Sequence, residues 1–491
     1  MRSEADVALG IDLGTSSVGV VALDSAGTVV ARADNPVPLH TPRAGWTEQD
    51  PADWTSAAEA GMRAVGAAID PTRVAVIGLS GQMHGMVALD GEGRVVHPAI
   101  LWNDGRTADQ VAAIERVVGR DPVVRRTGNR PVPGFQLPKV LWLRDNLPEV
   151  FARVEHVLFP KDYLGMHLTG RRYAEPSDAS GSGCFDLAAR EWDAGILGAL
   201  DLAPNLWPEL VHSHEIVGEL HSGLASRVGL PAGTPVVAGA GDNAAAAAAL
   251  GLGSTGPTVV GSVSLGTSGV VQVPAAAPEG DPEGRVHLFA DAFGDYLMLG
   301  VTLAAAGSLR WYRDTFAPGV GYQELMARAA ASAPGANGVT FVPYLAGERT
   351  PHMRSDLRAS FNGLSLATTD GDMVRAVIEG VAYALRDALD VMRPVLATSP
   401  QRFLATGGGA VSDLWLQTIA TLYGTPIGRP IDARGGAYEV GAAEGAAVLA
   451  WRGLGVTVDT APRHERLFEP GAELAALEDG YARYLESSRR N

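Results

Sequence analysis

The sequence predicts an α/β protein built from two copies of one domain, and three observations lead to this prediction. A length of 491 residues is too great for one hydrophobic core, so two or three domains are expected. Residues 8–21 read as an apolar strand, a Leu-Gly-Thr-Ser turn and a second apolar strand, and residues 263–271 repeat this pattern about half a chain later. The compact apolar run 74–79 follows a helical segment and is typical of a central parallel strand.

The composition is that of an acidic globular protein. The formal net charge is −16, and 46% of the residues are hydrophobic while 19% are charged. This balance excludes a disordered chain and argues against nucleic acid or an anionic membrane surface as the main partner. Residues 243–278 carry no charge, but the run is crowded with Gly, Ser, Thr and Pro, which predicts a buried hinge region rather than a membrane span.

Cysteine and lysine usage restricts the chemistry. Cys184 is the only cysteine, so no internal disulfide and no cysteine zinc site can form, which fits a reducing cytoplasm. The first six residues contain no apolar signal core, which agrees with a cytoplasmic location. Lys139 and Lys161 are the only lysines, and each follows a proline, so the Gly-Lys-Ser/Thr motif of P-loop NTPases is absent. Any phosphate must then be bound by backbone N–H groups, hydroxyls and a metal ion.

Each repeated turn has the chemistry of an anion-binding hairpin tip. Gly14 and Gly266 can adopt positive φ, and each is followed by hydroxyl residues. Asp12 precedes the first turn, whereas Ser264 holds this position in the second. A carboxylate beside a phosphate loop is repulsive unless a cation lies between them, so Asp12 is a candidate Mg²⁺ ligand, with turn capping as its alternative role. The hydroxyl residues are Thr15, Ser16 and Ser17 in the first tip and Thr267 and Ser268 in the second.

The first half continues with a predicted strand pair over 22–33, a helix over 54–69 and the strand 74–79. This strand ends in the turn Ser80-Gly81-Gln82-Met83-His84-Gly85. Side chains at the carboxyl end of a central strand face the ligand crevice, so Met83 and His84 are candidate contacts to a small polar substrate. His84 can orient a sugar hydroxyl or carbonyl, and a purely structural histidine fits the same position about equally well.

Residues 99–107 predict a strand and then a polar turn into a helix. Trp102 and Asp104 lie in this turn. An aromatic ring beside a carboxylate suits the wall of a polyol site, although Asp104 can as easily be a helix N-cap. Helices are expected next over 137–146 and from residue 160.

The segment 235–250 predicts a strand, a glycine turn and an alanine-rich helix that begins near Asp242. Formally it matches the dinucleotide fingerprint Gly-x-Gly-x-x-Ala, but no acidic residue follows about 20 positions later, and Asp242 would point a charge at the pyrophosphate. The sequence favours the role of a general base for Asp242, which the helix N-terminus would keep ionised. An ordinary N-cap aspartate accounts for the same location.

The second half begins with an expected connector over 251–258 and then repeats the hairpin. Strands are expected over 287–290 and 296–300, and a helix over 372–392 has an apolar stripe that predicts core packing. A strand over 403–405 leads into Gly407-Gly408-Gly409 and a helix from about residue 412. Three glycines before a helix permit close approach to a flat ring or a phosphate, which predicts the adenosine site.

Taken together, these motifs resemble those of the FGGY family of carbohydrate kinases. The resemblance runs from about residue 8 to residue 450, and its most specific parts are the Met-His turn and the Gly-Glu-Arg-Thr-Pro-His run. It implies a duplicated actin-like (ribonuclease H-like) ATPase fold with two lobes around a central cleft. The implied division is a sugar-binding lobe with the catalytic base at 1–250 and a nucleotide-binding lobe at 251–491. The motifs that carry the resemblance are Ser80–Gly85, Ile100–Arg106, Lys161–Leu164, Gly241–Ala244, Ser264–Gly269 and Tyr344–His352.

The resemblance also implies roles for individual residues. Asp242 would be the catalytic base, and Asn243, Met83 and His84 would contact the ketose. Mg²⁺ and phosphate would be bound by Asp12 together with Thr15, Ser16 and Ser17. Two departures stand out: Asp413 holds a position near the adenine where some relatives have Asn, and Glu444 interrupts a segment that is usually apolar. The residues expected to hold ATP are Gly266, Thr267, Gly408, Gly409 and Asp413.

The activity implied is ATP-dependent phosphorylation of D-xylulose to D-xylulose 5-phosphate. A kinase for another ketose or polyol, such as L-ribulose, gluconate or glycerol, remains open because one or two wall residues decide which hydroxyls fit. A non-kinase actin-like ATPase module is the alternative of a different class, and the absence of a peptide-binding β-domain after Leu449 argues against it. The expected partners are the sugar and ATP, with no nucleic acid and no membrane; a homodimer remains open.

Overall fold

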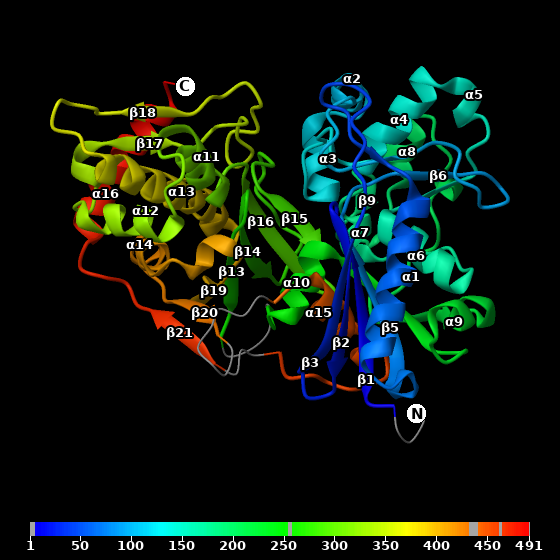
Figure 1. Cartoon of the computed structure of the whole chain (residues 1–491). Coiled ribbons are helices and arrows are strands. Elements are labelled where there is room, and N and C mark those ends of the chain that lie inside the picture. The colour runs from blue at the N-terminus through cyan, green and yellow to red at the C-terminus, as the bar shows by residue number, and fades with distance from the viewer. Residues whose placement is uncertain (1–4, 254–257, 432–439, 461–463, 491) are drawn as a thin grey trace.

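The computed structural model describes residues 5–253, 258–431, 440–460 and 464–490. Figure 1 shows two lobes side by side, each containing a sheet with helices packed around it, and α10 (Asp242–Ala249) and α15 (Ala442–Gly453) lie between them. The expected connector at 251–258 falls partly outside the described residues.

The N-terminal lobe contains a six-stranded sheet in the order β11-β12-β5-β1-β2-β3. β1 pairs antiparallel with β2 and parallel with β5, and β5 in turn pairs parallel with β12. Nearly every residue of β5 is buried, as expected for a strand covered by helices on both faces. The strands are β1 (Val7–Leu13), β2 (Ser17–Asp24), β3 (Val29–Pro36), β5 (Val74–Gly81), β11 (Ile216–Glu219) and β12 (Pro235–Gly241).

The C-terminal lobe repeats this topology in a seven-stranded sheet, β15-β16-β14-β13-β19-β20-β21. β13 pairs antiparallel with β14 and parallel with β19, just as β1 does with β2 and β5. The predicted duplication is therefore confirmed, and the fold is the actin-like (ribonuclease H-like) ATPase fold, with β15 added at one edge. The strands are β13 (Val260–Leu265), β14 (Gly269–Ala275), β15 (His287–Ala290), β16 (Tyr296–Thr302), β19 (Arg402–Thr406), β20 (Ile427–Pro430) and β21 (Glu465–Phe468).

The helices begin and end where local chemistry favours it. Asp50 caps α1 (Pro51–Ala68) by accepting the N–H of Ala52, and Thr369 forms a capping box with Asp372 at the start of α13 (Asp370–Met392). The predicted apolar stripe of α13 is buried in the C-terminal core. The other helices are α2 (Ala108–Val117), α3 (Arg120–Thr127), α4 (Gln136–Asn146), α5 (Pro148–Phe151), α6 (Pro160–Thr169), α7 (Pro176–Ala179), α8 (Ala194–Ala199), α9 (Ser222–Val228), α11 (Ala306–Phe316), α12 (Tyr322–Ala331), α13 (Asp370–Met392), α14 (Asp413–Tyr423) and α16 (Leu474–Ser488).

Short strands complete the two lobes. In the N-terminal lobe β4 pairs with β7, β6 with β8 and β9 with β10, and in the C-terminal lobe β17 pairs with β18. Their bounds are β4 (Glu48–Gln49), β6 (Val87–Leu89), β7 (Ala99–Ile100), β8 (His156–Leu158), β9 (Phe185–Asp186), β10 (Glu191–Trp192), β17 (Thr340–Val342) and β18 (Ser360–Asn362).

Helix α15 belongs to the second half of the sequence but packs on the N-terminal sheet. Its apolar residues share a core cluster with β1, β2, β5 and β12. The approach is close because a Cβ on Gly10 would lie 1.9 Å from the carbonyl oxygen of Ala443, and one on Gly445 would lie 1.8 Å from that of Ala245. Glu444, the departure noted in the sequence, accepts the N–H of Gly441 and forms an ion pair with Arg32 on β3. This residue therefore caps α15 and ties it to the N-terminal lobe.

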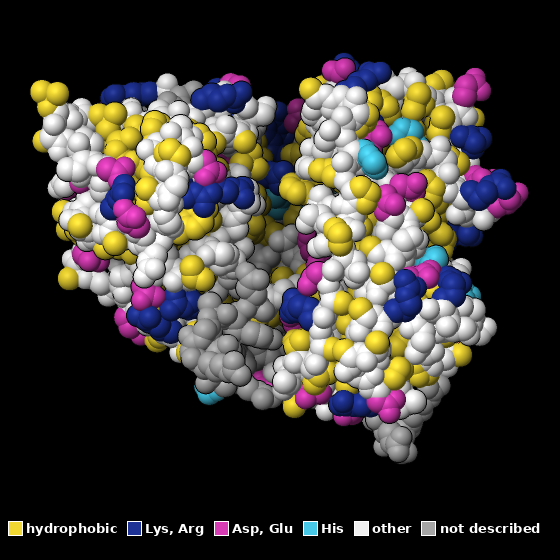
Figure 2. All heavy atoms as spheres, viewed as in Figure 1, with side chains coloured by type: hydrophobic (Ala, Val, Ile, Leu, Met, Phe, Trp, Pro, Cys, Tyr) yellow, Lys and Arg dark blue, Asp and Glu magenta, His cyan; other side chains and the backbone are white. Residues whose placement is uncertain are grey.

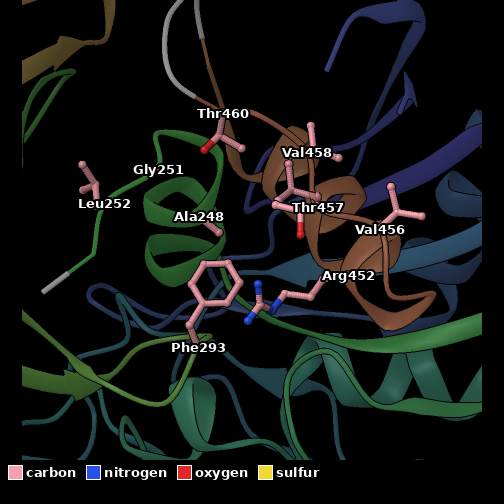
Figure 3. A pocket seen from close by; sticks show the side chains of 10 residues that line it. Ala248, Gly251, Leu252, Phe293, Arg452, Val456, Thr457, Val458 and Thr460 are labelled. Atoms are coloured by element: carbon pink, nitrogen blue, oxygen red, sulfur yellow. The ribbon is translucent and has the colours of Figure 1, made fainter. Parts of the chain in front are cut away.

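A small cavity of about 190 Å³ lies where α10 and α15 end (Figure 3). The guanidinium carbon of Arg452 lies 5.1 Å from the centre of the Phe293 ring, which comes from the turn between β15 and β16. This contact joins the end of α15 to the turn between β15 and β16 of the C-terminal lobe. Among the described residues, no helix combines the length and apolar character that a membrane span requires.

Candidate active site

A deep groove separates the two lobes, and basic and histidine side chains are visible inside it (Figure 2). Asp12 lies near the end of β1, and its charge acts on Asp242. Its Oδ1 is buried and has no hydrogen-bond partner among the described residues. Burial, the largest cause, raises the pKa of Asp12 to about 6; the Ser80 side chain acts in the opposite direction, and the charge of Asp34 adds to the rise. An unpaired carboxylate oxygen of this kind fits the donor chemistry that Mg²⁺ prefers.

Asp242 begins α10 directly after β12. Its Oδ1 accepts the N–H of Asn243 at 2.7 Å and the side-chain amide of Asn243 at 2.9 Å. Burial raises the pKa of Asp242 to about 7, and the negative charge of Asp12 adds to this, while the two Asn243 hydrogen bonds act in the opposite direction. The sequence predicted a carboxylate that the helix N-terminus keeps ionised. In the structure desolvation outweighs that effect, and a pKa near 7 is well matched to a general base at neutral pH.

The candidate sugar residues Met83 and Asn243 lie together beside Asp242. The amide nitrogen of Asn243 lies 3.8 Å from the sulfur of Met83. Gln272 on β14 donates to Asn243 Oδ1 at 3.1 Å, and Ser262 on β13 donates to Gln272 Oε1 at 2.8 Å. Residues of both lobes therefore orient the Asn243 amide. Gln272 was not found from the sequence, because nothing in a strand pattern marks a single inward-facing glutamine.

His84 is held in an unusual backbone conformation, with φ 69°. Lys139 donates to its carbonyl oxygen at 2.7 Å, which fixes the turn. Its Nδ1 lies 3.0 Å from the carbonyl oxygen of Gly181, which can only accept, so Nδ1 carries the proton and Nε2 is an acceptor. Burial, followed by the charge of Lys139, holds the pKa of His84 well below its usual range, so the ring is neutral. The rings of Phe135 and Phe289 lie 4.8 and 5.6 Å from it, centre to centre.

The first hairpin tip is tied to the N-terminal lobe. Thr15 donates its hydroxyl to Gln82 and accepts the indole N–H of Trp102 at 2.9 Å. Gly14, which was expected to tolerate positive φ, does not adopt it, and neither does Gly266 in the second tip. Ser16 is exposed at the tip and Ser17 is partly so. The Trp102 side chain therefore contacts the first hairpin tip directly.

Asp104 does not face the groove with a free carboxylate. Its Oδ1 accepts the N–H and Nε of Arg106, and its Oδ2 accepts the N–H of Thr47 at 2.6 Å and Nη2 of Arg106 at 2.7 Å. This differs from the predicted sugar contact. Both oxygens are saturated by partners in the N-terminal lobe, so the carboxylate organises the turn around Arg106.

The second hairpin tip lines a cavity of about 370 Å³. Gly266, Thr267, Gly408 and Gly409 all contribute to its wall, so the structure brings together four residues that were predicted to hold ATP; their binding of ATP stays a prediction. The carbonyl oxygens of Gly266 and Thr267 accept N–H groups at the start of α11, which anchors the tip. Further residues line this cavity that no motif marked, because they come from separate helices: Leu309, Arg310, Tyr322, Met326, Val411, Ser412 and Trp415.

Asp413 lies outside this cavity. Its two carboxylate oxygens form ion pairs with Arg429 at 2.9 Å and Arg466 at 2.7 Å, on the side of β20 and β21. The prediction of a nucleotide contact is therefore corrected to a structural ion pair. The neighbouring Ser412 lines the cavity and caps α14 by accepting the N–H of Trp415.

A cavity of about 360 Å³ is lined by residues of both lobes. Asp242 and Asn243 of the N-terminal lobe face Ser264, Thr406 and Gly407 of the C-terminal lobe across it. Ser264 lies at the end of β13, which leads into the second hairpin tip. Thr406 ends β19, and Gly407 begins the glycine turn that lines the nucleotide-type cavity. Asp242 of the N-terminal lobe therefore lines the same cavity as the strand ends that lead into the glycine loops of the C-terminal lobe.

The chain belongs to the FGGY family of carbohydrate kinases. The N-terminal domain of this family matches residues 7–251 and the C-terminal domain matches residues 261–453. The protein is 40% identical over 443 residues to the xylulose kinase of Escherichia coli strain K12, which covers 90% of this chain and 89% of that protein. It is 38% identical to the xylulose kinase of Lactococcus lactis, over 85% of this chain and 83% of the relative.

Solved structures agree with this assignment. A crystal structure described as a xyloylose kinase from Brucella ovis superposes with a TM-score of 0.90 at 38% identity, over 98% of each chain. A gluconate kinase from Lactobacillus acidophilus superposes with a TM-score of 0.91 at 25% identity, over 99% of this chain and 98% of that one. The protein is thus a carbohydrate kinase that transfers a phosphoryl group.

Proposed function

We propose that the protein transfers the γ-phosphoryl group of ATP to the C5 hydroxyl of D-xylulose. The observation that carries this proposal is the cavity in which Asp242 faces Ser264 and Gly407 across the groove. Relatives at 38–40% identity over most of the chain are named xylulose kinases, which supports D-xylulose as the acceptor.

Asp242 is the general base of the proposed reaction. It takes the proton of the C5 hydroxyl as that oxygen attacks the γ-phosphorus. A base with a pKa near 7 is partly ionised at neutral pH and still strong enough to accept the proton. Asn243 donates two hydrogen bonds to Oδ1 and so orients the other oxygen of the carboxylate toward the substrate.

The sugar lies between Met83, His84 and Asn243 in this proposal. Neutral His84 accepts a hydrogen bond from a sugar hydroxyl at Nε2, and Trp102 forms the wall near the first hairpin tip. ATP occupies the cavity lined by Gly266, Thr267 and Gly408-Gly409, where backbone N–H groups and hydroxyls replace the lysine of a P-loop.

Asp12, with its unpaired buried oxygen, is the residue that would hold Mg²⁺, and the ion when bound neutralises charge on the transferring phosphoryl group. One or two carboxylates are the usual protein contribution to such a site, with phosphate and water oxygens completing the shell. Ser16 and Ser17 offer hydroxyls at the adjacent tip.

A panel of acceptors tests the proposal. D-xylulose, L-ribulose, D-gluconate and glycerol are each assayed for ADP release with MgATP, and D-xylulose is expected to give the highest kcat/KM. A higher value for another acceptor would replace D-xylulose as the substrate. ATP hydrolysis that no sugar stimulates would instead favour the non-kinase ATPase module.

A further inference from the structure

Lys139 has no part in the mechanism described above, although it touches the turn that carries His84. It lies near the start of α4, and its side chain is fully buried. Within the described part of the chain, its amine forms no ion pair and donates to two backbone carbonyl oxygens, those of His84 at 2.7 Å and of Gly134. An amine is costly to bury unless hydrogen bonds compensate, so these two contacts account for its place in the interior.

The local sequence explains why the Gly134 carbonyl takes its hydrogen bond from a side chain. In a helical turn this carbonyl would accept from the residue four positions later, which is Pro138 and has no N–H. The amine of the next residue, Lys139, donates instead. A Cβ on Gly134 would lie 2.5 Å from the carbonyl oxygen of Trp102, so the loop before α4 lies directly against the polar turn that carries Trp102.

The same helix holds the turn that carries His84. With φ 69°, His84 lies in the left-handed region, which a residue other than glycine keeps only when its surroundings hold it there. Gln136 Nε2 donates to the carbonyl oxygen of Gly85, the next residue of the turn, at 3.2 Å. Gln136 and Lys139 are three positions apart and therefore lie on the same face of α4. One face of this helix thus holds two successive carbonyls of the turn.

The backbone of His84 determines where its ring can act. Nδ1 lies 3.0 Å from the carbonyl oxygen of Gly181, and the ring centre lies 4.8 Å from that of Phe135, the residue before α4. The carbonyl, Nδ1 and one face of the ring are therefore all held, and Nε2 remains as the acceptor. The hydrogen bonds of Asp242 involve none of these residues, so the turn and the proposed base are held separately.

We propose that Lys139 is a positioning residue of the sugar site, whose amine ties the carbonyl of His84 to that of Gly134 and so keeps His84 Nε2 where it accepts from a sugar hydroxyl. The inference rests on the proposed function, because it requires the sugar to lie at His84. An ammonium and a neutral amine both have enough N–H donors for two carbonyls, so the role does not depend on the charge of Lys139. An apolar side chain of similar length would leave both carbonyls without this donor.

Sugar affinity and turnover of Lys139→Met test the proposal. The variant keeps the length of the side chain and removes the amine. Its Kd for D-xylulose, measured by calorimetry without nucleotide, is expected to rise about tenfold. KM for ATP and kcat at saturating sugar are expected to stay within about threefold of the wild type, because the contacts of Asp242 are unchanged. Arg144→Met is the matched control with unchanged sugar affinity, since Arg144 lies on the same helix and donates to the carbonyl oxygen of Leu200 at 2.6 Å.

A double-mutant cycle separates positioning from general support of the fold. His84→Ala removes the ring that Lys139 is proposed to position. If Lys139 acts through this ring, adding Lys139→Met to His84→Ala is expected to change the Kd for the sugar by less than about twofold. A loss in the double variant that multiplies the two single losses would show that Lys139 acts independently of His84 and would overturn the proposal. A lowered kcat with unchanged sugar affinity would overturn it as well.

Lys139→Gln covers the case in which Lys139→Met does not fold. Its shorter amide cannot reach both carbonyls as the lysine does, and a loss of sugar affinity of about threefold or more with retained kcat is expected. Unchanged sugar affinity in either folded variant overturns the proposal. If the wild type phosphorylates D-xylulose and the variants bind it normally, only this proposal fails. If the acceptor panel selects another sugar, the assignment of D-xylulose fails, and the same variants are assayed with that sugar.

Discussion

Three aspartates show how partners decide the chemistry of a residue. Asp104 and Asp413 form ion pairs with arginines, which occupy the carboxylate oxygens of both aspartates. Among the described residues, Asp242 accepts hydrogen bonds only from the backbone and side-chain amides of Asn243, and burial raises its pKa. A carboxylate is available for proton transfer only where it forms no ion pair with a basic side chain.

The first prediction concerns the rate of the chemical step. Asp242→Asn removes the proton acceptor but keeps the size of the side chain, so kcat is expected to fall roughly 100-fold or more while D-xylulose affinity stays within about threefold. A coupled assay of ADP release and calorimetry measure the two quantities. Asp413→Asn is the control, and its kcat is expected to remain near the wild-type value. A near-normal rate in Asp242→Asn would remove Asp242 from the mechanism.

The second prediction concerns stability against pH. The folded pKa of Asp242 lies above its unfolded value, so the unfolded chain loses this proton first as the pH rises. Stability is therefore lost between about pH 4 and pH 7, and Asp242→Asn removes that penalty. The variant is expected to melt a few degrees higher than the wild type at pH 8, with no difference near pH 4, in metal-free buffer. An equal difference at both pH values would contradict this account.

The third prediction concerns the sugar site. His84→Ala deletes an acceptor and a ring between Phe135 and Phe289, so KM for D-xylulose is expected to rise about tenfold or more while KM for ATP stays the same. Initial rates over a grid of both substrates measure the split. An unchanged KM for the sugar would return His84 to a structural role.

At the scale of elements, the packing of α15 explains several glycines at once. Gly10 on β1, Gly78 on β5 and Gly445 on α15 each meet a backbone atom at 2.0 Å or less if given a Cβ. The helix can therefore lie directly on the sheet of the other lobe. Interiors packed this closely do not absorb an added methyl group without backbone shifts.

The fourth prediction follows from that packing. Gly445→Ala is expected to destabilise the protein by about 1–3 kcal/mol, because the added carbon would lie 1.8 Å from the carbonyl oxygen of Ala245. Gly198→Ala in α8 is the matched control, since nothing lies within 4 Å of its added carbon, and an unchanged or slightly raised melting temperature is expected. Similar melting temperatures for the two variants would mean that α15 packs more loosely than the structure shows.

At the scale of the whole molecule, the groove separates the proposed base from the glycine loops proposed to hold the nucleotide. Asp242 belongs to the N-terminal lobe and the glycine loops belong to the C-terminal lobe. In the proposed reaction, closure of the lobes around both substrates brings the reacting groups together and excludes water. α10 and α15 lie between the lobes (Figure 1), and we expect the hinge of this closure there.

The fifth prediction is closure on binding. D-xylulose together with a non-hydrolysable ATP analogue is expected to reduce the radius of gyration measured by small-angle scattering, because rigid lobes rotate about a hinge. The ATP analogue alone serves as the control and is expected to give a smaller change. A radius that stays constant with both ligands would mean that the groove is already in its working shape.

Local sequence patterns by themselves determined the strands, the repeated hairpin, the apolar stripe of α13 and the glycine turn, because alternation, helical periodicity and turn chemistry act over a few neighbouring residues. The same patterns marked Asp12, His84 and Asp242 as candidates. Only the tertiary structure decided that Asp104 and Asp413 are occupied, that Ser412 lines the nucleotide-type cavity and that α15 returns to the first lobe. These outcomes depend on partners such as Thr47 and Arg466, which lie more than 50 residues away along the chain. A side chain's role is set by the atoms that surround it, and folding brings most of those atoms from elsewhere in the sequence.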